Sequence, residues 1–93
     1  MDVENINDYK SLFNYAKDKY ENSAAYRVNT KTITDTKKMK RARSLGMFDH
    51  AFGAVQKLEK QNPQKKEDYR KMLRSVRRTL SLSKEDAFVK GDK

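Results

Sequence analysis

Three segments of this chain carry the same apolar pattern, in which an aromatic residue is followed by apolar residues three, four and seven positions later. That spacing places all four side chains on one face of an α-helix. Three helices with one apolar face each are able to close a single core, so the pattern predicts an all-α fold, a small bundle of three main helices. The three sets are Tyr9, Leu12, Phe13 and Ala16; Phe48, Ala51, Phe52 and Val55; and Tyr69, Met72, Leu73 and Val76.

Helix breakers and cap-type residues set the expected limits of these helices. Extending the second apolar segment backwards would bring lysine and arginine onto its apolar face, so we expect a kink near Gly46. Pro63 ends this segment, because the residue before a proline is pushed out of the helical region. The stretch 27–36 is rich in β-branched residues, lacks a helical period and is expected to be a loop. The expected helices span 6–25, 35–45, 47–61 and 64–82.

The last residues predict one more element. The stretch 83–86 resembles a capping box and precedes three apolar residues, Ala87, Phe88 and Val89, so we expect a short C-terminal helix. A chain of 93 residues is too short for two cores, which predicts one domain over 1–90 and a tail at 91–93. Because so small a core is only marginally stable, a homo-oligomer is also expected.

Composition argues against several classes of protein. The chain has no cysteine, which excludes a disulfide framework and a cysteine nucleophile. The first residues are acidic and no segment approaches the roughly 18 apolar residues of a membrane span, so we expect a cytoplasmic protein. His50 is the sole histidine, and no glycine-rich phosphate loop is present. The sequence therefore predicts no catalytic residue, no metal site and no cofactor, and we expect that this protein is not an enzyme.

The positive charge is concentrated in two segments. The chain carries 22 Lys and Arg against 13 Asp and Glu, a formal net charge of +9. Residues 27–43 alone carry +6 and residues 64–78 carry +5, whereas residues 1–26 carry −2. Such self-repulsion disfavours the compact state unless an anionic partner offsets it.

Both basic segments are candidates for contact with phosphate. On the predicted helix 64–82, a spacing of 100° per residue places six cations on one arc beside the apolar face. Arginine dominates this arc, and its guanidinium group matches phosphate in a bidentate manner. We expect helix packing to bring both segments to one cationic surface. The candidate nucleic-acid-binding residues are Lys37, Lys38, Lys40, Arg41, Arg43, Lys66, Arg70, Lys71, Arg74, Arg77 and Arg78.

Two tyrosines stand outside the apolar faces. Tyr15 falls off the predicted core face of the first helix, and Tyr26 follows that helix next to Arg27. Both are candidates for stacking on a base. With Arg27 and Lys31, Tyr26 also forms a cationic and aromatic cluster suited to a nucleotide or a cyclic dinucleotide.

Taken together, the residues favour a small basic, non-enzymatic nucleic-acid-binding protein with an accessory or regulatory role. One alternative is an adaptor or inhibitor that docks on an acidic partner protein. A third is an oligomer that sequesters a nucleotide. A membrane partner is disfavoured, because the apolar side of the basic helix is already needed for the core.

Overall fold

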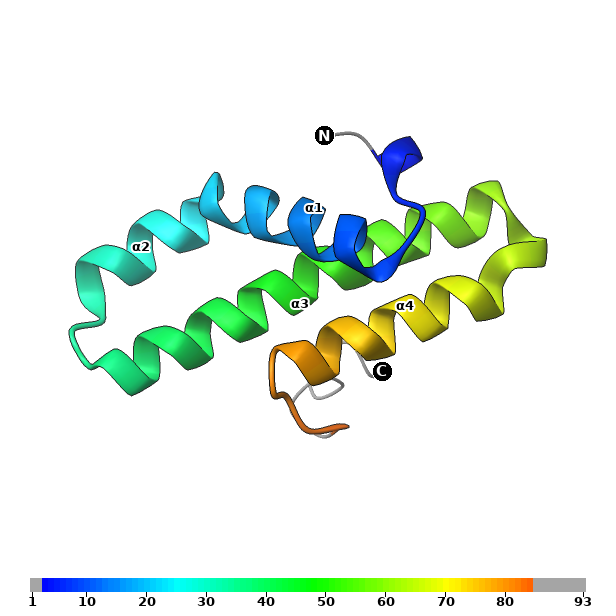
Figure 1. Ribbon diagram of the computed structural model, residues 1–93. Coiled ribbons are helices and arrows are strands. Elements are labelled where there is room, and N and C mark those ends of the chain that lie inside the picture. Colours follow the sequence, from blue (N-terminus) through cyan, green and yellow to red (C-terminus); the bar gives the residue numbers. More distant parts are fainter. Residues whose placement is uncertain (1–2, 85–93) are drawn as a thin grey trace.

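The computed structural model describes residues 3–84, and all regular elements in that range are helical (Figure 1). The predicted all-α class and small bundle are confirmed. No helix in this range is both long enough and apolar enough to cross a bilayer. The C-terminal helix expected after residue 83 lies outside the described residues. The elements are the 3-10 turn η1 (Val3–Asn5), α1 (Tyr9–Glu21), α2 (Ala24–Thr32), α3 (Thr36–Gln61), the 3-10 turn η2 (Pro63–Lys65) and α4 (Lys66–Thr79).

The core lies between α1, the second half of α3, and α4. The three predicted apolar faces meet there, and each contributes at least one residue with a fully covered side chain. Of the twelve predicted residues, Tyr9 is 40% exposed and Phe13, Phe52 and Met72 are partly buried. The buried residues are Ile6, Leu12, Tyr15, Ala16, Tyr20, Met47, Phe48, Ala51, Ala54, Val55, Leu58, Tyr69, Leu73, Val76 and Leu82.

Side-chain caps make the first helix shorter than the predicted 6–25. At its start, the Asp8 carboxylate accepts a hydrogen bond from the Ser11 N–H at 2.8 Å, and the Ser11 hydroxyl accepts one from the Asp8 N–H at 3.1 Å. The Ser11 N–H and the Ser11 hydroxyl, which donates to the same carboxylate at 2.9 Å, together lower the pKa of Asp8 below its usual 3.8. At its end, Asn22 donates to the Asp18 carbonyl and Ser23 caps the next helix. The chain therefore bends where continuous helix was predicted.

The predicted loop over 27–36 is wrong for most of its length, because α2 occupies residues 24–32. Its threonines satisfy their hydroxyls within the helix: Thr30 donates to the Arg27 carbonyl at 3.0 Å, and Thr32 donates to the Val28 carbonyl at 2.8 Å. Their low helix propensity is a weak preference that local packing overrides. Only residues 33–35 connect α2 to α3, whose first turn is capped by the Asp35 carboxylate.

The two helices expected on either side of Gly46 are one continuous helix of 26 residues, α3. Gly46 instead allows α1 to approach closely. A methyl group added there would lie 2.5 Å from Cδ1 of Tyr20, far inside van der Waals contact. The absence of a side chain at this position therefore gives the Tyr20 ring its place against the α3 backbone.

Tyr20 also holds α2 in position. Its hydroxyl accepts a hydrogen bond from the Asn29 amide at 3.0 Å, and its ring meets the Tyr26 ring edge to face, with centroids 5.7 Å apart. Only 2% of Tyr20 is exposed, so one α1 side chain contacts α2 and α3 together. No residue of α2 is itself buried.

Residues 24–45, comprising α2, its connection and the first ten residues of α3, form what we call the basic hairpin. Its two helices run side by side and extend beyond the end of α4 (Figure 1). The first buried residue of α3 is Met47, so no residue of the basic hairpin is fully buried in the core. Val28 is the most exposed large apolar residue of the described chain, at 56%.

A Schellman motif ends α4. The Leu82 N–H donates to the Arg77 carbonyl at 3.1 Å, and the Ser81 N–H donates to the Arg78 carbonyl at 3.0 Å. Ser81 has a φ of 60°, the left-handed conformation that glycine usually supplies at this position. Leu82 turns back into the core, where it is buried. The motif therefore fixes the turn after α4 with a residue that is strained there.

We expect the substitution Ser81→Gly to raise the free energy of unfolding by about 1 kcal/mol, because glycine adopts a positive φ without steric cost. Ser75→Gly is the matched control. Ser75 lies within α4, where glycine lowers stability by roughly 0.5 kcal/mol. Urea denaturation followed by circular dichroism measures both changes. Equal destabilisation by the two substitutions would contradict the strain assigned to Ser81.

Candidate nucleic-acid interface

The basic hairpin presents an excess of positive charge. It contains seven Lys and Arg against one Asp, a formal charge of +6. All seven cations are exposed, and the single carboxylate, that of Asp35, accepts hydrogen bonds from the backbone at the start of α3. Within residues 3–84, Lys37, Lys38, Lys40 and Arg43 take part in no ion pair. These four cations therefore face solvent without an ion-pair partner among residues 3–84.

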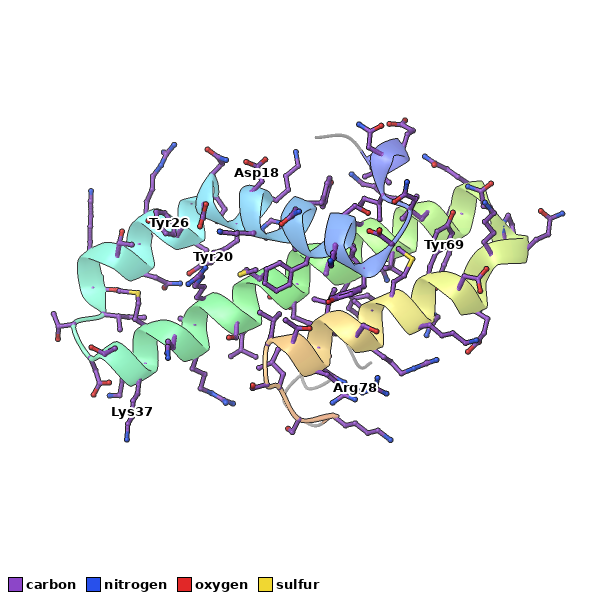
Figure 2. All side chains as sticks on the ribbon, viewed as in Figure 1. Asp18, Tyr20, Tyr26, Lys37, Tyr69 and Arg78 are labelled. Carbon is purple, nitrogen blue, oxygen red and sulfur yellow. The ribbon has the colours of Figure 1, made fainter. Side chains whose placement is uncertain are left out.

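Two of these lysines stand where a helix disfavours them. Lys37 and Lys38 lie in the first turn of α3, which carries no acidic residue. The helix dipole is positive at that end, and a cation there is unfavourable by a few tenths of a kcal/mol or more. Figure 2 shows Lys37 pointing outward at the far end of the hairpin. The local charge therefore lowers the stability of the fold and leaves a surface suited to an anion.

The cations of α4 are partly engaged within the protein. Arg70 donates through Nε to the Glu59 carboxylate of α3 at 2.7 Å, and this hydrogen bond raises the pKa of Arg70 above its usual value. Arg74 reaches Glu67 at 3.3 Å, and Arg77 donates to the Leu82 carbonyl at 3.0 Å. These contacts neutralise or occupy half of the predicted arc.

The remaining cations of α4 are Lys66, Lys71 and Arg78. All three are exposed and form no ion pair among the described residues. Figure 2 shows Arg78 directed outward near the end of α4. They contribute positive charge to α4, but Arg78 is the only arginine among them, so the predicted arc is not a continuous row of unpaired arginines within residues 66–79.

Six of the predicted cations line two different grooves, three in each, and the single shared surface expected from the sequence stays a prediction. The hairpin groove encloses about 490 Å³ and is lined by Phe13, Lys40, Arg41, Arg43, Ser44, Met47, Thr79, Leu80, Ser81 and Leu82. The arginine groove, of about 100 Å³, is lined by Phe48, Phe52, Arg70, Leu73, Arg74, Arg77 and Lys84. The two share no lining residue, although Arg77 of one contacts Leu82 of the other.

The two candidate aromatic residues have different surroundings. The prediction that Tyr15 is available for stacking is wrong, because it is buried with 6% of its surface exposed and Lys19 covers its ring at 5.5 Å. Its position lies close enough to the edge of the predicted apolar face to join the core. Tyr26 is 38% exposed, and Arg27 and Lys31 are exposed on the same helix. These three residues therefore belong to the basic hairpin.

Sequence reasoning missed the residues that join distant segments. Glu59 pairs with Arg70 from another helix, and the hairpin groove combines Phe13 of α1 with Leu80 and Ser81 after α4. No motif connects these positions in the sequence. Helical phase identifies the face on which each one lies, but it does not identify the partner face.

No cluster of metal ligands emerges in the described part of the chain. No three His, Asp or Glu side chains of residues 3–84 cluster as metal ligands do, and His50 is partly buried on α3. Comparisons with protein-family models, with curated proteins and with solved structures find no match to this chain.

Proposed function

We propose that this protein is a non-catalytic nucleic-acid-binding protein and that the basic hairpin is its contact surface. The observation that carries this proposal is the set of exposed cations on a helical hairpin that has no fully buried residue. Polyanion binding is driven by the release of counterions from phosphates, which requires accessible Lys and Arg rather than a shaped cavity. In this proposal Lys37, Lys38, Lys40 and Arg43 contact phosphates, with Arg41, Arg27 and Lys31 alongside them.

The contrast between the two basic surfaces supports the hairpin over α4. Arg70 and Arg74 are each held by a carboxylate of the protein, so contact with a phosphate requires them to exchange one anion for another. The hairpin lysines have no such competitor within residues 3–84. Residues 66–79 still carry six Lys and Arg against two Asp and Glu, so α4 adds long-range attraction. The principal contacts are assigned to the hairpin.

A salt titration tests the proposal. If about six phosphates are neutralised, the logarithm of the association constant falls against the logarithm of salt concentration with a slope of about −4 for a single strand and about −5 for a duplex. Fluorescence anisotropy with labelled DNA and RNA of unrelated sequences, between about 50 and 200 mM salt, measures that slope. We expect similar affinities across sequences, because phosphate contacts carry no sequence information.

A capture experiment distinguishes nucleic acid from an acidic partner protein as the ligand. A tagged form of the protein is used to capture ligands from extract, with and without nuclease treatment. Loss of the captured material after nuclease is the expected result. An acidic protein that stays bound after nuclease, together with no detectable affinity for either labelled strand at low salt, would overturn the proposed function.

A further inference from the structure

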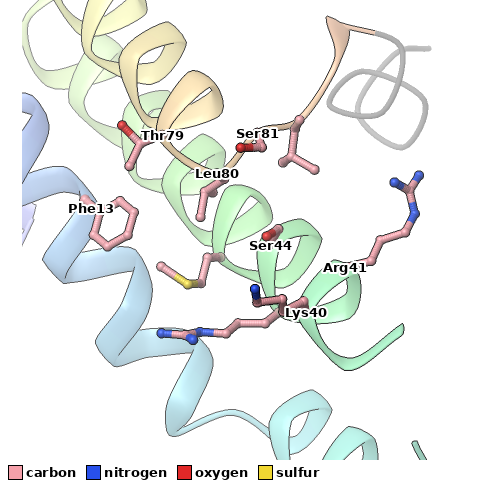
Figure 3. A pocket seen from close by; sticks show the side chains of 10 residues that line it. Phe13, Lys40, Arg41, Ser44, Thr79, Leu80 and Ser81 are labelled. Carbon is pink, nitrogen blue, oxygen red and sulfur yellow. The ribbon is translucent and has the colours of Figure 1, made fainter. Parts of the chain in front are cut away.

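The hairpin groove brings together three elements that are far apart in the sequence. The first half of α3 forms one wall, α1 contributes Phe13, and the turn after α4 contributes Leu80, Ser81 and Leu82. Figure 3 shows Phe13 beside Thr79 and Leu80 at one end of the groove and Arg41 at the other. Its volume of about 490 Å³ falls within the range of about 300–1,000 Å³ typical of small-molecule sites.

The lining of this groove has three kinds of chemistry. Lys40, Arg41 and Arg43 supply positive charge from α3. Apolar surface comes from Phe13, Met47, Leu80 and Leu82, of which Phe13 and Leu80 are only partly buried. Hydroxyl groups come from Ser44, Thr79 and Ser81. A ligand that satisfies this lining carries a negative charge, a flat apolar face and polar edges on one molecule.

A nucleotide unit has these properties. Its phosphates suit the cations, its base offers an apolar face for an aromatic side chain, and its edges carry both donors and acceptors. Hydroxyl groups donate and accept alike, so those of Ser44 and Ser81 suit any base edge and select none. The Thr79 hydroxyl donates to the Ser75 carbonyl at 2.9 Å and offers the groove an acceptor. The strained backbone of Ser81 fixes one of these residues in the lining.

We propose that the hairpin groove receives an unpaired base of single-stranded nucleic acid while the adjoining phosphates lie against Lys40 and Arg43. This inference rests on the proposed function and specifies its substrate class. In a duplex the bases are paired and stacked on one another, so their faces are not accessible to a side chain. The basic hairpin then supplies the electrostatic attraction, and the groove supplies a preference for single strands.

Abasic strands test this inference directly. The probes are a labelled single strand of about ten nucleotides, the same strand with its internal bases removed, and a duplex of equal length. The phosphate backbone is common to the intact and abasic strands, so their difference reports the bases. A base stacked on an aromatic residue increases affinity by about tenfold or more. We therefore expect the abasic strand to bind about tenfold more weakly than the intact strand.

The variant Phe13→Leu tests whether the contribution of the bases to affinity arises in the hairpin groove. Leucine keeps an apolar side chain in the partly buried position of Phe13 and removes the aromatic face. We expect it to weaken binding of the intact strand severalfold and to leave binding of the abasic strand unchanged. The unchanged abasic affinity shows at the same time that the variant is folded and that its basic hairpin is intact.

The outcomes separate the two proposals. Failure of every probe to bind at low salt would reject both. Equal binding of the intact and abasic strands, or a duplex bound as tightly as the intact strand after allowance for its higher charge density, would reject the base site and leave phosphate binding by the hairpin in place. A loss on base removal that Phe13→Leu does not alter would also reject this groove as the site.

Discussion

The fourfold variant K37E/K38E/K40E/R43E is expected to lose on the order of a thousandfold in affinity for a single strand at about 50 mM salt. With each phosphate contact on a single strand contributing about −0.7 to the salt slope, the loss of four contacts removes about 3.6 decades at that concentration. The slope itself is expected to fall from about −4 to about −1. Anisotropy titrations at several salt concentrations measure both quantities.

The variant is expected to be at least as stable as the parent protein. All four side chains are exposed and form no ion pair among residues 3–84. Glutamate at positions 37 and 38 also lies in the first turn of α3, where a negative charge is favoured by about 0.3–1 kcal/mol per residue. A thermal melt therefore checks that lost binding is not lost folding. A variant that loses affinity while it keeps or gains stability has lost an interaction surface and not its fold.

A control with the same change in net charge separates location from total charge. The variant K10E/K17E/K57E/K65E reverses four exposed lysines outside the basic hairpin and α4. Both variants lose eight units from the formal charge of +9. We expect the control to bind within about tenfold of the parent, because screening at about 10 Å limits distant charges. Equal losses in the two variants would show that net charge, and not the hairpin, governs binding.

The bundle could be predicted because its cause is local and periodic. A stripe of apolar residues at helical spacing marks a buried face regardless of which helix covers it, and all three predicted faces meet in the core. The basic hairpin was visible as charge for a similar reason, since its seven cations lie within 17 consecutive residues. Charge density, like periodicity, can be seen in one segment of the sequence without knowing which other segment packs against it.

The predictions that were wrong concern features that depend on contacts between distant residues. Residues 24–32 contain weak helix formers, and the contact of Tyr20 with Asn29 and Tyr26 stabilises them as helix. Glycine allows both a kink and a close approach, and only the position of the Tyr20 ring decides between them at Gly46. The pairing of Glu59 with Arg70 was missed for the same kind of reason. Each is a tertiary contact that helical phase alone does not specify.

The two glycines of α3 provide a matched pair for the role of Tyr20. Gly53→Ala is expected to raise the free energy of unfolding by up to about 1 kcal/mol, because nothing lies within 4 Å of the added methyl group and alanine is the better helix former. Gly46→Ala gains the same helix propensity but drives a methyl group into the Tyr20 ring. Overpacking of a buried site costs typically 1–3 kcal/mol and occasionally more, so we expect a net loss of about 2 kcal/mol.

The ring has no inexpensive way to move. Its hydroxyl accepts a hydrogen bond from Asn29, its ring meets the Tyr26 ring edge to face, and the residue is almost fully buried, so displacing it breaks contacts to α2. For a domain of this size, a loss of about 2 kcal/mol lowers the melting temperature by roughly 10 °C. Calorimetry or urea denaturation of the two glycine variants provides the measurement. The same sign of change at both glycines would contradict the close approach of Tyr20.

A double-mutant cycle attributes the loss to this one contact. Tyr20→Leu removes the ring and is destabilising by itself, because it leaves a cavity and an unsatisfied Asn29 amide. If the ring is what the methyl group meets, Gly46→Ala in the Tyr20→Leu background costs far less than in the parent and approaches the gain seen at Gly53. The coupling energy is then expected to be about 2–3 kcal/mol, the loss in the parent plus the gain that the Tyr20→Leu background restores, whereas independent sites add within about 0.5 kcal/mol. Since Tyr20 also positions α2, the same cycle read by strand affinity measures how strongly this contact supports the basic hairpin.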